Sequence, residues 1–279
     1  MLDLDRDTYP YLEDVNEGIL RQFRRAAGSP ERVLDVGCGQ ATLAAEIRNL
    51  GHVVWGIEAN SIAVERAASH IGRCIHADLL DFKAIEGILA DERFDAIVFS
   101  DVLEHLYDPL TALRFYGRFL APGGRVLISV PNALNWQTRL SFLCGRFEYQ
   151  DTGVLDRTHV RFFTFRSATR LLQAAGCSIE KTDFTPLLVR AFLPAIKRLL
   201  VSRAAGAGQE RRRAILDSPL FRFYLRWIYP AEYFLASVRK PLFAFRIVLV
   251  ARMSPASREG RRTISRNHHA RPGSPSING

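Results

Sequence analysis

Closely spaced cysteines are absent from the sequence. The four cysteines, Cys38, Cys74, Cys144 and Cys177, are scattered and form no C-x-x-C pair. This spacing argues against a zinc ribbon or a disulfide framework and favours a reducing compartment. We therefore expect a cytoplasmic protein.

Long apolar runs are also missing. No stretch of about 18 uncharged apolar residues occurs, so the sequence predicts no membrane span. The first residues, Met1 to Asp5, do not combine a basic segment with an apolar one, so we expect no signal peptide. With 279 residues, 48% of them hydrophobic, the chain is long enough for one large α/β domain.

Acidic residues are scarce in two late parts of the chain. Residues 186–240 contain eleven Lys and Arg but three Asp and Glu, and residues 251–279 contain six and one. Because the net charge of the whole chain is +9, the remainder is mildly acidic. Large apolar side chains alternate with the arginines of 186–240, which disfavours nucleic acid as a partner.

A glycine turn between residues 33 and 43 is the most informative stretch. The apolar residues before Gly37 predict a buried strand, and helical periodicity begins after Gly39. Glycines let the backbone turn tightly and approach a ligand, and the following helix offers free N–H groups. The stretch therefore predicts a site for a nucleotide-type cofactor.

Two readings of this turn compete. A dinucleotide fingerprint wants glycine at position 42, where the chain has Thr42. The pattern acid-x-Gly-x-Gly-x-small is met by Asp35, Gly37, Gly39 and Ala41, and resembles the first motif of class I S-adenosylmethionine (SAM)-dependent methyltransferases. Ala41 replaces the glycine often found there, from which we expect tighter packing and retained binding.

The acids after the next two predicted strands fit the same cofactor. Glu58 follows the strand 52–57 at about the interval at which an acid binds both ribose hydroxyls. The resemblance implies that Asp78 accepts from the adenine amino group beside Leu79; alternatively Asp78 caps a helix, a role that Asp81 could also take. The predicted cofactor-binding residues are Asp35, Gly37, Cys38, Gly39, Glu58, Ala59, Asp78, Leu79 and Ser100.

The residues after the fourth predicted strand, 94–100, make the resemblance more specific. The run from Asp101 to Pro109 is similar to the fourth-strand motif of small-molecule methyltransferases, which include the ubiquinone-pathway O-methyltransferases. Ligands lie beyond the carboxyl ends of strands in such sheets, so Asp101, Glu104 and His105 are expected beside the transferred methyl group.

A second stretch, 145–164, looks like a signature of bacterial methyltransferases of glycan and lipid-linked pathways. Some related enzymes hold a divalent metal with an acid-x-x-Glu-His run and a later His, which Asp101, Glu104, His105 and His159 match. The predicted catalytic residues are these four, with or without a metal. Alternatively, His159 anchors a loop by hydrogen bonding and Glu104 orients a neighbouring group.

The last predicted strand, 242–251, should pair antiparallel with the strand 178–184, as the methyltransferase resemblance implies. The intervening basic and aromatic segment 186–240 is then an insertion within a domain of residues 1–253. It could dip into a membrane surface on the cytoplasmic side, cover the acceptor as a lid or form a dimer interface. Residues 254–279 have no apolar periodicity and are predicted to be disordered.

The resulting expectation is a Rossmann-like, doubly wound sheet of seven strands, mostly parallel, with an antiparallel final strand. The resemblance implies a SAM-dependent methyltransferase whose acceptor is a hydroxyl of a small molecule, a glycan or a lipid-linked intermediate. Two alternatives stay open: a non-catalytic SAM-binding scaffold docked at a membrane through 186–240, and an NAD-dependent enzyme, which Thr42 and the final strand disfavour.

Overall fold

The computed structural model describes residues 15–24, 29–187 and 224–254. Seven strands form a single sheet in the order β3-β2-β1-β4-β5-β7-β6. Their bounds are β1 Arg32–Val36, β2 Val53–Glu58, β3 Arg73–His76, β4 Phe94–Ser100, β5 Leu120–Pro131, β6 Cys177–Pro186 and β7 Ala244–Met253. The first five strands are parallel, and β7 lies antiparallel between β5 and β6. The predicted fold class and the predicted antiparallel final strand are confirmed.

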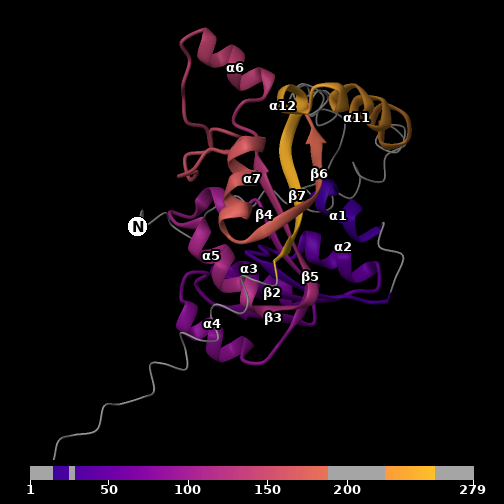
Figure 1. Ribbon diagram of the computed structural model, residues 1–279, viewed down its shortest axis with the longest axis vertical. Coiled ribbons are helices and arrows are strands. Elements are labelled where there is room, and N and C mark those ends of the chain that lie inside the picture. The colour runs from indigo at the N-terminus through magenta and orange to yellow at the C-terminus, as the bar shows by residue number, and fades with distance from the viewer. Residues whose placement is uncertain (1–14, 25–28, 188–223, 255–279) are drawn as a thin grey trace, which may run out of the picture.

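Helices cover both faces of the sheet (Figure 1). One face packs against α1, α2 and α3, and the other against α4, α5 and α7. The helix bounds are α1 Glu17–Arg24, α2 Thr42–Asn49, α3 Ser61–Ala68, α4 Phe82–Leu89, α5 Pro109–Tyr116, α6 Trp136–Leu143, α7 Phe165–Ala174, α11 Tyr229–Val238 and α12 Lys240–Phe243. The central strands β1 and β4 are buried on both faces because they are largely apolar runs, as parallel strands usually are, whereas the outer strands β3 and β6 are partly exposed.

Polar side chains begin several helices where the sequence predicts it. Asn60 accepts a hydrogen bond from the Ala63 amide at the start of α3, and Asp81 accepts one from the Ala84 amide at the start of α4. Asp81 thus takes the capping role that the sequence also allowed for Asp78. Asp78 instead accepts from the Leu80 amide in the turn after β3.

Several predicted boundaries are corrected. The sequence predicts a helix over 41–50, but Ala41 precedes α2 instead of opening it, because its backbone is left-handed. The sequence also predicts a helix over 110–120; it ends at Tyr116 and continues as the short 3-10 helix η2, Gly117–Phe119, and β5 begins at Leu120. A further helix is predicted over 219–229; the structure describes it from Tyr224, where a π-helical turn, η3 (Tyr224–Ile228), leads into α11.

Some predictions concern residues outside the described ranges. The sequence also predicts a helix over 11–27, of which the structure describes only α1. It predicts a further helix over 187–201 and a break over 204–213; beyond Leu187 these fall outside the described part of the chain, as does the tail beyond Ser254. Among the described residues, no helix is long and apolar enough to cross a membrane.

Candidate active site

The glycine turn joins β1 to α2 at the sheet edge where strand order reverses between β1 and β4. Gly37 and Gly39 have φ values of +73° and +55°, which side chains rarely adopt. A Cβ atom on Gly37 would lie 2.7 Å from a Val102 methyl group and 3.4 Å from one of Leu79. The turn therefore needs glycine for conformation and for space, and it lies against residues that follow β3 and β4.

Glu58, at the end of β2, is held against this turn. One carboxylate oxygen accepts a hydrogen bond of 2.9 Å from the Gly39 amide. The other accepts from the amides of Ala59 and Asn60, also at 2.9 Å. The predicted ribose-binding acid and the predicted glycine turn are thus in direct contact.

Asp35, the acid of the first motif, is almost fully buried. Its Oδ1 has no hydrogen-bond partner among the described residues. Burial, with the nearby charge of Glu58, raises the pKa of Asp35 to about 7. A ligand group that donates a hydrogen bond at the turn would therefore stabilise the Asp35 carboxyl group.

Asp101 follows β4 directly and has a left-handed backbone, with φ of +56°. Its Oδ1 accepts from the Ser129 hydroxyl at 2.8 Å, and its Oδ2 lies 2.6 Å from Nε of Arg246 in an ion pair. The Asn16 amide group donates to the hydroxyls of Ser100 and Ser129. Asp101 is thus fixed by contacts from β5 and β7, at the edge where the predicted methyl-transfer site lies.

Glu104, His105 and His159 come together beyond β4, although more than fifty residues separate His159 from the other two. One ligand-type atom from each lies within 4.8 Å of the others. The two imidazole rings meet edge to face, 4.8 Å apart, and His159 Nε2 lies 4.0 Å from a carboxyl oxygen of Glu104. Within the described chain, Asp101 is not part of this group.

Glu104 has an unusual environment for a carboxyl group. It is 1% exposed, and neither side-chain oxygen has a hydrogen-bond partner among the described residues. Burial, and then the charge of Asp101, raises the pKa of Glu104 well above its usual range. Such an orphaned buried carboxyl group is costly to keep unless it serves a ligand, a metal or a proton transfer.

Hydrogen bonds orient the two histidines. His159 Nδ1 lies 3.0 Å from the Val154 carbonyl oxygen, which can only accept, so Nδ1 carries a proton and donates it. His105 Nδ1 contacts the carbonyl and hydroxyl oxygens of Thr158. Burial, with His159 nearby, lowers the pKa of His105. His105 is therefore presented to the cluster as a neutral imidazole.

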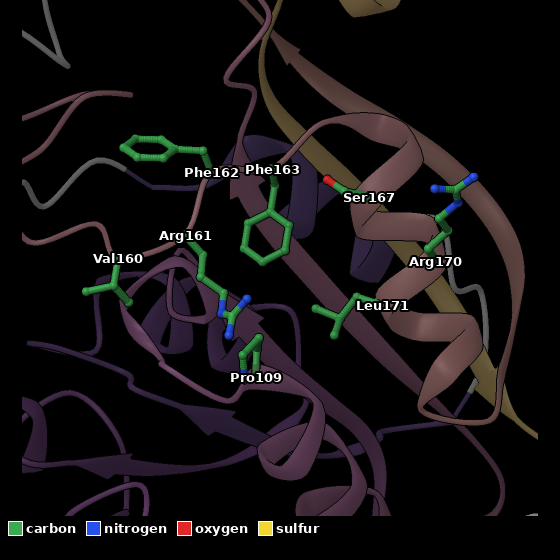
Figure 2. A pocket seen from close by; sticks show the side chains of 8 residues that line it. All are labelled: Pro109, Val160, Arg161, Phe162, Phe163, Ser167, Arg170 and Leu171. Atoms are coloured by element: carbon green, nitrogen blue, oxygen red, sulfur yellow. The ribbon is translucent and has the colours of Figure 1, made fainter. Parts of the chain in front are cut away.

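A surface groove lies beside the cluster, between the segment 160–163 and α7 (Figure 2). Its volume is about 580 Å³. Phe163 and Leu171 point toward one another in this view, whereas Phe162 points away. The same segment is tied to the cluster, because the amides of Val160 and Arg161 donate to the Glu104 carbonyl oxygen.

Comparison with known proteins identifies the family of this chain. The family model described as a methyltransferase domain matches residues 11–182, more than half of the chain. The chain belongs to the methyltransferase-domain family. It is a class I SAM-dependent methyltransferase, and SAM is its cofactor.

Relatives agree with this assignment, and a solved structure shares the fold. A ubiquinone biosynthesis O-methyltransferase of Dinoroseobacter shibae is 31% identical over 63% of this chain and 75% of its own length. A probable SAM-dependent methyltransferase of Mycolicibacterium smegmatis is 32% identical over 58% and 57%. A SAM-dependent methyltransferase from Archaeoglobus fulgidus shares the fold, with a TM-score of 0.52, 17% identity and coverage of 84% and 90%.

Three site residues of this methyltransferase were missed by sequence reasoning. Arg246 is a single charge in the apolar run of the last strand, which could have marked it as functional. Thr158 lies inside the recognised segment 145–164 but was not singled out. Asn16 gave no signal, because its contacts with Ser100 and Ser129 span more than eighty residues of chain. The roles of the predicted cofactor-binding residues remain predictions.

Proposed function

We propose that this methyltransferase transfers the SAM methyl group to a hydroxyl oxygen of a small molecule, a glycan or a lipid-linked intermediate. The observation that carries the proposal is the buried cluster of Glu104, His105 and His159 beyond β4. A relative named as an O-methyltransferase supports oxygen as the acceptor atom. The cofactor would bind along the glycine turn, Glu58 and the residues after β3, leaving the cluster for the acceptor.

The chemistry follows from the state of the two histidines. A hydroxyl group is a poor nucleophile until its proton leaves, and a neutral imidazole can take that proton near pH 7. His159 Nε2 lies 4.0 Å from the Glu104 carboxyl group, and burial favours the uncharged form of His105. The site must also align the acceptor oxygen with the sulfonium methyl group.

The same residues fit a divalent metal. Glu104 offers two buried oxygens without hydrogen-bond partners in the described chain, and two imidazoles lie beside it. Mixed carboxylate and imidazole ligands suit zinc, iron or manganese at least as well as magnesium. A bound ion would lower the pKa of an acceptor hydroxyl. Asp101, the fourth residue of the predicted ligand set, is instead engaged by Arg246 and Ser129.

Transfer of a labelled methyl group tests the proposal. The protein is incubated with methyl-labelled SAM and a bacterial extract separated into small molecules, glycans and lipids. We expect label in one fraction, in a linkage with the chemical stability of a methyl ether. Label in an amine or on carbon would contradict the hydroxyl acceptor. Tight SAM binding with no transfer to any fraction would favour the alternative of a non-catalytic SAM-binding scaffold.

Chelation distinguishes a mechanism in which the histidines act as bases alone from one that requires a metal. If the histidines act as bases alone, prolonged treatment with EDTA leaves methyl transfer unchanged. If a metal is required, transfer is lost, and adding back manganese, iron or zinc restores it. The His159→Ala variant should then also lose the stoichiometric metal measured by mass spectrometry.

We further propose that α11 contacts a membrane surface. The buried side of α11 carries Glu232 and Ala236, whereas Phe234 and Val238 are both 70% exposed and Trp227, in the preceding turn η3, is 62% exposed. Basic residues flank this apolar stripe, as in helices that lie in a bilayer interface.

Liposome flotation tests this membrane contact. The protein should float with anionic vesicles at low salt, and a variant with serine at positions 227, 234 and 238 should float less. Serine at the exposed residues Leu140 and Leu143 of α6 provides the matched control. Failure of the wild type to float would contradict the contact.

A further inference from the structure

Two cysteines that are far apart in the sequence meet at the cofactor turn. The sulfur atoms of Cys38 and Cys74 lie 3.7 Å apart and share a hydrogen bond. Cys38 lies between Gly37 and Gly39, and Cys74 lies in β3 opposite Gly56 of β2. A Cβ atom on Gly56 would lie 2.5 Å from the Cys38 sulfur. The glycine in β2 therefore makes the space in which the two thiols meet.

The two thiols have different environments. Cys38 is buried, and its pKa is raised, first because its thiol hydrogen-bonds to Cys74 and then by burial. Cys74 is partly exposed, and the hydrogen bond from Cys38 lowers its pKa. A partly exposed thiol whose thiolate is stabilised is the more reactive partner, and a neighbouring buried thiol can resolve its oxidised form.

A covalent bond between these sulfurs would change the turn. A disulfide has a sulfur–sulfur distance of about 2.05 Å, so the two atoms must approach each other from 3.7 Å by more than 1.5 Å. Cys38 is flanked by two left-handed glycines, and the next amide, that of Gly39, donates to Glu58. Movement of Cys38 therefore disturbs the contact that joins the turn to the ribose-binding acid.

We propose that Cys38 and Cys74 form an oxidation site that closes a disulfide and weakens SAM binding. Hydrogen peroxide is the oxidant. The Cys74 thiolate attacks one peroxide oxygen, so that an S–O bond forms and the O–O bond breaks. The hydroxide that leaves takes a proton and becomes water. The Cys38 sulfur then loses its proton and attacks the Cys74 sulfur. An S–S bond forms, the S–O bond breaks and a second water leaves. The two thiols lose two electrons, and one peroxide gains them.

This inference rests on the SAM site and is independent of the acceptor. The test uses the full chain, reduced and then treated with a small excess of hydrogen peroxide. Peptide mapping by mass spectrometry identifies the cross-link, and calorimetry measures the affinity for S-adenosylhomocysteine, the demethylated product. We expect a peptide joining Cys38 to Cys74 and about a tenfold or greater loss of affinity, about 1.4 kcal/mol, which a dithiol reductant reverses.

Variants of two cysteines make the result specific. Cys74→Ser and Cys74→Ala should bind the product as the reduced wild type does and should not respond to peroxide. Cys144→Ser, which removes an exposed thiol at the end of α6, should respond as the wild type does. The proposal is overturned if Cys144 oxidises while no bond joins Cys38 to Cys74. It is equally overturned if the bond forms and the affinity stays within twofold of the reduced value.

Discussion

At the scale of single residues, Ala41 shows how this chain departs from its family pattern. It is fully buried and left-handed, with φ of +62°. A left-handed backbone costs a residue with a Cβ atom about 1 kcal/mol, which glycine avoids. Its burial agrees with the tighter packing that the sequence predicts, and retained SAM binding stays a prediction; the backbone strain could be seen only in the structure.

Replacing Ala41 with glycine should therefore be nearly neutral. Relief of strain offsets the greater freedom of the unfolded chain and the lost methyl contacts, so we expect a change within about 0.5 kcal/mol. Ala45→Gly, one turn later inside α2, should cost about 1 kcal/mol because its backbone is already helical. Urea unfolding of both variants provides the comparison. Equal losses of stability would contradict the strain at Ala41.

Asp35 gives a pH-dependent prediction at the same scale. Its pKa is raised from 3.8 to about 7, so the folded protein binds a proton that the unfolded chain releases. The stability that this proton provides is present at low pH and is lost as the pH rises from about 4 to 7. The stability of Asp35→Asn relative to the wild type should thus increase between about pH 4 and pH 7. A difference in unfolding free energy that stays constant over this range would contradict the raised pKa.

At the scale of elements, α11 is held by a buried acid of β6. Asp183 forms an ion pair of 3.2 Å with Arg21 of α1 and accepts hydrogen bonds from Gln22 and from the Tyr233 hydroxyl. Burial opposes its ionisation, but Arg21 and these donors hold the pKa of Asp183 below its usual range. The Tyr233 ring also stacks on Phe184. One carboxylate thus connects α1, β6 and α11.

Asp183→Asn should destabilise the protein by about 2–3 kcal/mol, because it removes the buried partner of Arg21. Glu17→Gln is the matched control, since Glu17 pairs with Arg24 on the surface and should contribute less than about 0.5 kcal/mol. Limited proteolysis would show whether α11 is released in the first variant. Similar unfolding free energies for the two variants would rule out this role of Asp183.

The elements themselves differ in how well the sequence predicts them. All seven strands were expected, because most are short apolar runs that end in glycine, proline or polar residues, and β6 alternates as an edge strand does. Helix α6 was not expected, since its exposed Leu140 and Leu143 obscure any apolar stripe. Contacts such as those of Asp183 could not be predicted, because they join residues more than a hundred positions apart.

At the scale of the whole molecule, sheet topology assembles the site. The strand order reverses between β1 and β4, and the carboxyl ends of β1, β2, β3 and β4 meet at one edge. Ligands of such sheets bind at this reversal. The glycine turn and Glu58 lie on one side of it, and the histidine cluster follows β4. The contact between the glycine turn and Glu58 was therefore predictable from spacing, whereas the partners of Asp101 depend on β5 and β7.

The most direct test asks whether a variant of the histidine cluster loses methyl transfer but still binds the cofactor. The measurement is transfer from labelled SAM by the His105→Ala/His159→Ala double variant, together with its affinity for S-adenosylhomocysteine, with His70→Ala on the surface as control. We predict that transfer falls about 100-fold or more, while the affinity stays within about threefold of the wild type. Unchanged methyl transfer by the double variant would contradict both the base and the metal role of the cluster.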